Sequence, residues 1–285
     1  MDLNLFSGIE AFGIEGLDSK NLFAEETKET KEEVVEKVPE KTPEEKELEM
    51  LLDKTYTCPV CDSSFKNRAV RTGKARLIRM DRDLRQVYED IEPLKYDIVS
   101  CTKCGFSAVS RFFVPMIPSS RKKVMETVGN KYRHQPEPEG IYPYAHALSR
   151  YKLALACDVV RNAKASEKAY TCLRAAWLCR SWKETLDPAD KAKVQPVEEL
   201  EKQFITNAYE GFIQAISKEM FPMCGMDEGT MNYLLGALAF ELGHIDVAAR
   251  MISSVIASPS VNSRTKEKAR DLKEEILMSI KGGNK

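Results

Sequence analysis

The sequence has few of the residues and motifs on which enzymes depend. Only 3 of its 285 residues are histidines, and none of them stands in a motif with a cysteine or serine nucleophile. The chain contains no Walker loop, no dinucleotide-binding glycine fingerprint, no G-x-S-x-G and no H-E-x-x-H. Because it has no recognisable set of catalytic groups, we predict that the protein is not an enzyme.

Long apolar runs are also lacking. No stretch approaches the roughly 20 apolar residues of a membrane span, and the first residues lack the basic start and continuous apolar stretch of a secretory signal. We therefore expect a cytoplasmic protein with no membrane partner. Thiols stay reduced in the cytoplasm, so the 8 cysteines are expected to be metal ligands or small buried residues, not disulfides.

Four of the cysteines form two C-x-x-C pairs in turn-like sequences. The pairs are Cys58 with Cys61 and Cys101 with Cys104. Pro59 stiffens the first turn, and Gly105 gives the backbone freedom that a tight exit from the second turn needs. Structural zinc takes four such ligands in a tetrahedron and leaves no open position for an activated water. We predict one structural zinc ion bound by these four cysteines.

Iron is the alternative to zinc, because a C-P-x-C turn combined with a C-x-x-C-G turn also resembles rubredoxin. The charged insertion between the two pairs argues against that compact electron carrier. The other four cysteines lie in or beside the C-terminal half, where free cysteine commonly packs as a small hydrophobe. We expect these four to be buried core residues: Cys157, Cys172, Cys179 and Cys224.

Charge is unevenly distributed, although the net charge is only −1. Residues 1–50 carry 15 acidic and 6 basic side chains, whereas residues 54–133 carry 17 basic and 8 acidic ones. The basic segment between the cysteine pairs could contact nucleic-acid phosphates or pair with its own carboxylates. We favour the self-paired surface. The residues of this candidate binding surface are Arg71, Arg76, Arg79, Asp81, Arg82, Asp83, Tyr88 and Tyr96.

Composition divides the chain into four parts. Residues 1–23 form a short motif with apolar anchors, and residues 24–53 form a charged linker that we expect to be disordered or transiently helical. Residues 54–118 are expected to fold as a small zinc-ribbon-like β module with a basic insertion. Residues 119–285 are expected to fold as an all-α domain. The opposite charges of the leader and the module also suggest that the leader covers the module until a partner displaces it.

Local patterns predict the elements of these parts. Strands are expected at residues 75–80, 96–100 and 106–113, with a short helix at residues 83–90. Helices are expected at residues 119–129, on both sides of residues 162–165, after Pro196, on both sides of residues 243–244, and after a cap at Ser263.

Two of the expected helix pairs fit the tetratricopeptide template, in which small residues let paired helices pack closely. A generic helical bundle is the alternative, because any antiparallel pair of helices needs small residues at its crossing. Either arrangement stacks helices into an array that usually presents a binding face. Template positions are occupied by Leu153, Ala156, Cys157, Ala169, Leu173 and Ala176, and by Leu235, Gly236, Gly243, Ala248, Ile252 and Val255.

The motifs together resemble a bacterial family of unknown function, DUF2225. The resemblance covers about residues 54–280 and runs from the first cysteine pair through R-x-x-K-A-R-L-I-R-x-D-x-D, Y-x-x-I-x-P-L-x-Y-D-I and C-x-x-C-G to L-R-A-A-W-L-C-R. It implies metal-type cysteines and carries no activity or catalytic residue. Asp62 stands where a glycine would complete a more typical turn, so we expect a less regular first turn. The signature residues are Arg76, Arg79, Asp81, Asp83, Tyr88, Pro93, Tyr96, Arg174, Ala176 and Trp177.

These inferences predict an α+β chain that is mostly α, with a small zinc-ribbon-like β module followed by an all-α tetratricopeptide-like array. The function that fits best is binding of another protein through the array. The alternative is a nucleic-acid-binding zinc module with a helical half that recruits or oligomerises.

Overall fold

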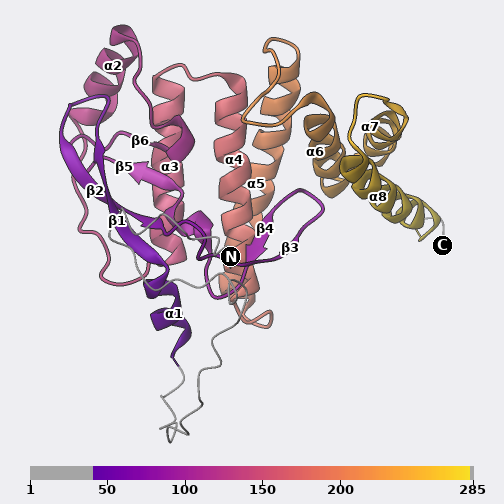
Figure 1. Ribbon diagram of the computed structural model, residues 1–285, viewed down its shortest axis with the longest axis horizontal. Helices are drawn as coiled ribbons and strands as arrows, with labels where there is room; N and C mark the ends of the chain where they lie inside the picture. Colours follow the sequence, from indigo (N-terminus) through magenta and orange to yellow (C-terminus); the bar gives the residue numbers. More distant parts are fainter. Residues whose placement is uncertain (1–40, 283–285) are drawn as a thin grey trace, which may run out of the picture. The chain divides into compact units, whose positions relative to one another are not determined.

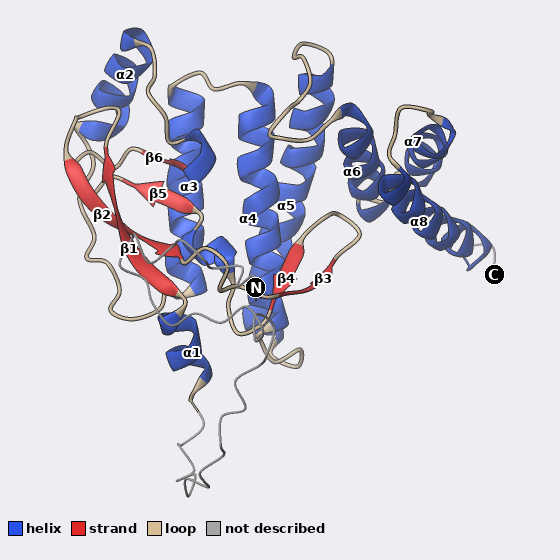
Figure 2. Cartoon of the chain, viewed as in Figure 1, coloured by secondary structure: helices blue, strands red, loops and turns tan. Residues whose placement is uncertain are grey.

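The computed structural model describes residues 41–282, and this part of the chain is mostly helical (Figure 1). Eight α-helices and six short strands occur within residues 41–282, and the strands lie in the N-terminal part with a cluster of four cysteines (Figure 2). The expectation of a mostly α chain with a small β region that carries the cysteines is confirmed. The predictions for residues 1–23 and 24–40 lie outside the described residues.

The elements follow one another as a β-rich part and then a helical part. The strands are β1 (Leu51–Thr57), β2 (Ser64–Val70), β3 (Leu77–Met80), β4 (Gln86–Tyr88), β5 (Ile98–Ser100) and β6 (Ser107–Val109). The helices are α1 (Pro43–Glu49), α2 (Pro118–Val124), α3 (Tyr144–Val160), α4 (Ala165–Glu184), α5 (Lys191–Ile216), α6 (Glu228–Glu241), α7 (Ile245–Ala257) and α8 (Ser263–Gly282). Short 3₁₀ turns cover Pro93–Tyr96 and Ser110–Phe112, and a π turn over Met125–Gly129 continues α2.

The strands form three separate antiparallel hairpins. Strand β1 pairs with β2 up to Thr57 opposite Ser64, and β5 pairs with β6 up to Ser100 opposite Ser107. Each of these two hairpins carries one C-x-x-C pair at its tip. We call these two hairpins, residues 51–70 and 98–109, the cysteine module, and α3 to α8 the helical half.

Helix α1 lies where the sequence predicts part of a linker. It begins with a capping box whose N-cap is Thr42. Glu47 on this helix is buried, and its carboxylate accepts hydrogen bonds from Lys95 Nζ (2.9 Å) and Tyr96 Oη (2.7 Å). The linker predicted over residues 24–53 is therefore wrong for its last residues, because a Glu- and Lys-rich composition does not reveal the distant partners of Glu47.

The predicted short helix at residues 83–90 is also wrong, because this segment forms a turn followed by β4. Two charged side chains in the turn point into the helical half. Asp83 is fully buried and accepts hydrogen bonds from Trp177 Nε1 and Arg180 Nη1, both at 2.8 Å. Arg85 is also buried, and its Nη1 donates to Ser181 Oγ at 2.9 Å. These long-range bonds favour the turn over a local helix.

The same turn also contacts the last helices. Tyr233 Oη on α6 donates to the carbonyl of Arg82 (2.8 Å), and Arg82 Nη1 donates to Glu275 on α8 (2.9 Å). Leu84 packs against the apolar cluster of α6, α7 and α8. The β3–β4 hairpin therefore contacts α4, α6 and α8 and connects them.

Helices α3 to α8 pack in chain order, each against the next. The predicted helix breaks at residues 162–165 and 243–244 are present. The predicted first residues of two helices, α8 and α5, are wrong. The N-cap of α8 is Asn262, whose Oδ1 accepts from Thr265 N–H (2.9 Å), and α5 begins at Lys191, one turn before Pro196. Pro196 is the sixth residue of α5, so it lies inside the helix and has no N–H to donate to the carbonyl of Ala192.

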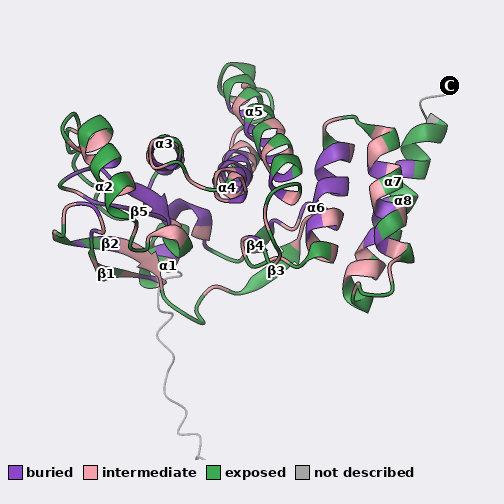
Figure 3. Ribbon diagram, turned by 90° about the horizontal axis from the view of Figure 1, so that it is seen from above, coloured by how far each residue is buried: buried purple, intermediate pink, exposed green. Residues whose placement is uncertain are grey.

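The core continues across the predicted boundary at residues 118 and 119. Leu94, Ile98 and Val109 lie in the same apolar core as α3 to α6. Figure 3 shows α4 and α6 as largely buried elements. A second cluster surrounds the cysteines, and a third joins α6, α7 and α8. Within residues 41–282, no helix combines the length and apolar content that crossing a membrane requires.

Candidate metal centre

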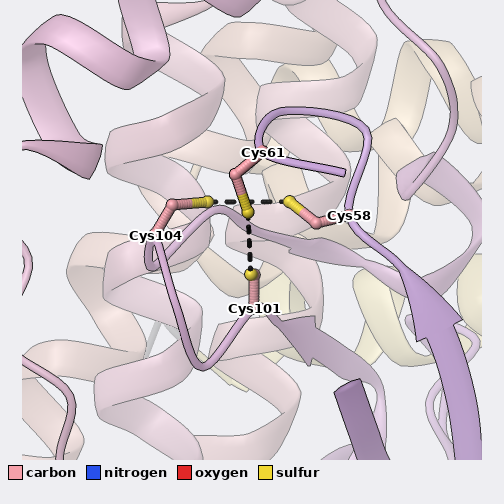
Figure 4. Close-up of side chains that lie close together, drawn as sticks. All are labelled: Cys58, Cys61, Cys101 and Cys104. Atoms are coloured by element: carbon pink, nitrogen blue, oxygen red, sulfur yellow. Dashed lines mark hydrogen bonds between the residues drawn. The ribbon is translucent and has the colours of Figure 1, made fainter. Parts of the chain in front are cut away.

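The tips of the two hairpins bring the four paired cysteines together. All four Sγ atoms lie within 4.8 Å of one another. The Sγ atoms of Cys58 and Cys104 are 3.6 Å apart, as are those of Cys61 and Cys101 (Figure 4). A tetrahedral zinc ion with Zn–S bonds of about 2.3 Å places its sulfurs about 3.8 Å apart, whereas a disulfide needs about 2.05 Å. The spacing fits four ligands of one ion and excludes disulfides.

The two cysteine turns share one backbone geometry. Asp62 (φ 56°) and Gly105 (φ 69°) both adopt the left-handed conformation directly after the second cysteine of each pair. Their N–H groups donate to the carbonyls of Cys58 (3.0 Å) and Cys101 (2.9 Å). Aspartate tolerates this conformation better than most residues other than glycine. The expectation of a less regular first turn is therefore wrong.

Apolar groups from several elements enclose the second turn. Phe106 and Ala108 are fully buried, and the Ser107 N–H donates to Cys157 Sγ on α3 at 3.5 Å. The ring of Tyr132 lies against Gly105 so closely that a Cβ there would be 2.2 Å from Tyr132 Cδ2. The centre is therefore sealed on the side of the helical half.

The crowded sulfurs influence one another's protonation. Hydrogen bonds from the Cys104 and Cys58 thiols lower the pKa of Cys101 to about 2. The contact with Cys101 raises the pKa of Cys58 to about 12 and also raises the pKa of Cys104. One thiolate is favoured beside protonated neighbours, because several negative sulfurs at this spacing repel. A bound divalent cation would take the place of these protons. The donor set therefore fits a thiophilic ion such as zinc.

The remaining cysteines do not join this centre. Cys172 and Cys179 are buried in the core of the helical half, Cys157 is buried beside Gly105, and Cys224 is half-buried. Burial raises the pKa of Cys157 and Cys224 to about 11 and that of Cys172 and Cys179 to about 12. They are mostly protonated at neutral pH and hence weak nucleophiles. The expectation of buried core residues is confirmed for all except Cys224.

The residues of the candidate binding surface do not form one exposed patch. Asp83 and Tyr96 are buried, and Tyr88 is half-buried. Arg71 Nε donates to the carbonyl of Leu51 at 2.8 Å. The other arginines are in ion pairs: Arg76 with Glu89, Arg79 with Asp81, and Arg82 with Glu275. The structure thus places most of these charges in contacts within the chain.

Sequence reasoning missed a charge network that runs along α4. Arg180 lies at its centre and donates to Asp83 (2.8 Å), Glu201 (2.7 Å) and Glu241 (2.6 Å). Lys183, one turn further on, lies 2.8 Å from the other carboxylate oxygen of Glu201. The sequence signal was a pair of cations, Arg180 and Lys183, one turn apart near the end of a helix whose middle is largely apolar.

A groove opens beside this network between α4, α5 and α6. It has a volume of about 380 Å³, and Lys183, Glu198, Lys202 and Glu241 contribute to its lining. A neighbouring cavity shares Lys183 and Glu241 and reaches the β3–β4 turn at Arg82. We call the two together the α4–α6 groove.

The comparisons with known proteins identify one related family. A family model described as "Uncharacterized protein conserved in bacteria (DUF2225)" matches residues 51–276. The matched region includes both cysteine pairs, the β3–β4 hairpin and most of the helical half. No curated protein and no solved structure matches the chain.

Proposed function

The chain belongs to this bacterial family, and we propose that it is a cytoplasmic, zinc-binding protein that binds other proteins and catalyses no reaction. In this proposal the four cysteines hold one structural zinc ion. The α4–α6 groove receives a segment of the partner. The groove is the observation on which the protein-binding role rests.

The zinc assignment is supported by the donor set and its enclosure. Cys58, Cys61, Cys101 and Cys104 supply four sulfurs within 4.8 Å of one another, two pairs of them 3.6 Å apart, and four thiolates leave no ligand position for water. Iron in the same ligand set would absorb visible light, whereas zinc would not. Elemental analysis and an absorption spectrum of the purified chain separate the two ions, and one iron atom per chain would contradict the zinc assignment.

The tetratricopeptide-like arrangement is supported by close helix crossings. A Cβ at Gly236 on α6 would lie 2.6 Å from Ile252 Cδ1 on α7, and a Cβ at Gly211 on α5 would lie 2.8 Å from Ala169 Cβ on α4. Small residues at such crossings let paired helices approach as they do in repeat arrays. Stacked pairs of this kind present a face on which a partner segment can lie.

Nucleic-acid binding is the second candidate, and it is favoured by the excess of basic residues in residues 54–133. The ion pairs of Arg76, Arg79 and Arg82 argue against it, because phosphate binding requires cations that are free to replace counterions. Binding carried by such contacts would fall by about 10³–10⁵-fold between 50 and 200 mM salt for 6–10 phosphate contacts.

An affinity capture from host lysate, with and without nuclease, tests the protein-binding role. We expect a stoichiometric protein partner that survives nuclease. The double charge reversal Glu198→Lys and Lys202→Glu changes two exposed residues of the groove and should release this partner. Glu210→Lys on the same helix, exposed but absent from the groove lining, is the matched control. Partners that disappear with nuclease would move the function to the basic module.

A further inference from the structure

The four clustered cysteines differ in their exposure to solvent. Cys58 and Cys101 are fully buried, and Cys104 is 3% exposed. Cys61 is half-buried. A cavity of about 410 Å³ also opens beside the first cysteine turn, and residues 57–59 contribute to its lining. Small reagents in water therefore reach the centre from the side of the first turn, and Cys61 carries the most accessible sulfur.

The opposite side of the centre is closed by other parts of the chain. Cys157 Sγ on α3 accepts from the Ser107 N–H, and the Tyr132 ring lies directly against Gly105. Val124 on α2 is fully buried in the apolar cluster that surrounds the cysteines. These contacts cover the second turn and leave the first turn uncovered, so the difference in exposure follows from the fold.

Among the eight cysteines, exposure and thiolate character combine at Cys61. A thiol that binds zinc is deprotonated, and the thiolate is the form that reacts with oxidants. Cys224 is also half-buried, but its Sγ donates to the carbonyl of Ser166 (3.3 Å), and burial raises the pKa of its thiol to about 11. Cys224 therefore has similar access to solvent without the reactive charge state.

A second ligand lies close to the accessible sulfur. The Sγ atoms of Cys61 and Cys101 are 3.6 Å apart and belong to different hairpins (Figure 4). A disulfide needs about 2.05 Å, so the two sulfurs would have to approach by about 1.6 Å. Cysteines that respond to oxidants commonly combine an accessible thiolate with a neighbouring thiol of this kind.

We propose that Cys61 is a peroxide-sensitive ligand of the zinc centre and that its oxidation releases the ion. The Cys61 thiolate attacks one oxygen of hydrogen peroxide, the O–O bond breaks, and a sulfenic acid and hydroxide result. The Cys101 thiolate then attacks the sulfur of the sulfenic acid, the S–O bond breaks, and a second hydroxide leaves. The two thiolates lose two electrons in forming the Cys61–Cys101 disulfide, and one hydrogen peroxide is reduced.

The inference rests on the proposed zinc site and adds a reactivity to it. After the reaction only Cys58 and Cys104 remain as ligands, and two thiolates do not complete the four-ligand sphere that structural zinc requires. The new disulfide joins the tips of the two hairpins in place of the ion. The oxidised chain therefore loses zinc while its cysteine module stays connected.

Peroxide treatment of the reduced, full-length, zinc-loaded chain tests the proposal. A coloured chelator reports released zinc, and alkylation followed by mass spectrometry identifies the cysteines that have reacted. We expect one zinc ion to be released for each Cys61–Cys101 disulfide, before Cys224 is oxidised. Cys224→Ser, outside the centre, should release zinc at the wild-type rate. Reduction with a dithiol and added zinc should restore the original zinc content.

Other products would overturn the proposal. A first disulfide within one turn, between Cys58 and Cys61 or between Cys101 and Cys104, would show that exposure and spacing across the hairpins do not direct the reaction. Two chains linked by a disulfide through Cys61 would assign its sulfur to a contact between copies. Oxidation of Cys224 while the zinc is retained would show that Cys61 is not the more reactive of the two.

The zinc content before oxidation keeps this proposal distinct from the proposed function. A reduced chain that contains one zinc ion and keeps it in peroxide would overturn only the reactivity of Cys61. A reduced chain that contains no zinc would overturn the zinc assignment and, with it, the release. Capture of a protein partner at the α4–α6 groove is independent of both results.

Discussion

The cysteine module and the helical half are held together by different forces. The module consists of two short hairpins, and isolated two-stranded hairpins are marginally stable in water. Four sulfurs within 4.8 Å offer a metal ion a place to join them. The helical half instead buries a continuous apolar core and a charge network centred on Arg180. The comparison predicts that the two hairpin tips depend on a bound ion in addition to their apolar packing, whereas the helical half depends on packing and on its charge network.

Loss of one of the four clustered cysteines should have the largest effect, because it should destabilise the cysteine module and leave the helical half folded. Cys101→Ser deletes one of four ligands, and structural zinc contributes about 10–16 kcal/mol in small zinc-finger modules. On the proposal that these cysteines bind zinc, we expect the purified variant to lack the ion and to become sensitive to protease within residues 51–70 and 98–109, while most of the helical circular dichroism remains. Cys224→Ser, outside the centre, is the control and should keep the metal. Full zinc content in the Cys101→Ser chain would contradict the assignment of the site.

The charge network provides the corresponding test of the helical half. Arg180→Ala leaves the buried carboxylates of Asp83 and Glu201 without their central partner, which costs about 3–5 kcal/mol of unfolding free energy. Arg76→Ala removes an arginine whose side chain is 81% exposed and pairs with Glu89, and it should cost less than about 1 kcal/mol. Urea unfolding of both variants measures the difference. Equal costs would show that the network does not stabilise the fold.

A pair of glycine substitutions sharpens the role of packing at the metal centre. Gly105→Ala introduces a Cβ 2.2 Å from the Tyr132 ring at a positive φ, and we expect a loss of roughly 2–5 kcal/mol from strain and overpacking together. Gly73→Ala has a similar φ with nothing within 4 Å, so only the backbone term of about 1 kcal/mol is expected. Thermal or urea unfolding tests this order. If Gly73→Ala lowered the unfolding free energy as much as Gly105→Ala, the contact with Tyr132 would not be a cause of the loss at Gly105.

The smallest expected effect concerns the segment that joins the two regions. Burial opposes ionisation of Glu137, but its hydrogen bond with His146 and the charge of Arg150 lower its pKa from 4.5 to about 2. A lowered pKa in the folded state stabilises the fold above the unfolded pKa, and this stabilisation is lost as the pH falls from about 4.5 towards 2.

Unfolding midpoints of the wild-type and Glu137→Gln chains, measured across this pH range, test the Glu137 contribution. The wild-type chain should be the more stable at pH 5, and the difference should shrink as the pH falls. Glu139→Gln, at an exposed position in the same segment, is the control variant. A difference that stays constant with pH would rule out titration of Glu137 as the cause.

The sequence predicted the features that depend on local chemistry. Two C-x-x-C pairs define their own turns, so the cluster of Cys58, Cys61, Cys101 and Cys104 could be predicted from spacing alone. The order and breaks of the helices from α3 to α8 followed from their apolar periodicity. Helix capping was less predictable: Asn262, and not Ser263, caps α8, because neighbouring polar residues compete for that role.

Features that depend on distant partners could not be predicted. Glu47 and Arg85 read as solvent-exposed charges in the sequence, yet both are buried by residues 48 to 99 positions away. Strands β1 and β2 were not predicted, because β1 buries only Leu51 and β2 buries Phe65 together with the polar Asn67.

The long-range contacts of the β3–β4 hairpin limit the order in which the chain can fold during its synthesis. Arg82 bonds to Glu275, 193 residues further along the chain, so its final contact cannot form until α8 has left the ribosome. Chains that make contacts of such large sequence separation pay their loop-closure entropy before the contacts form, and they fold slowly for that reason. The contacts of the β3–β4 turn with α4 can therefore form earlier in synthesis than its contact with α8.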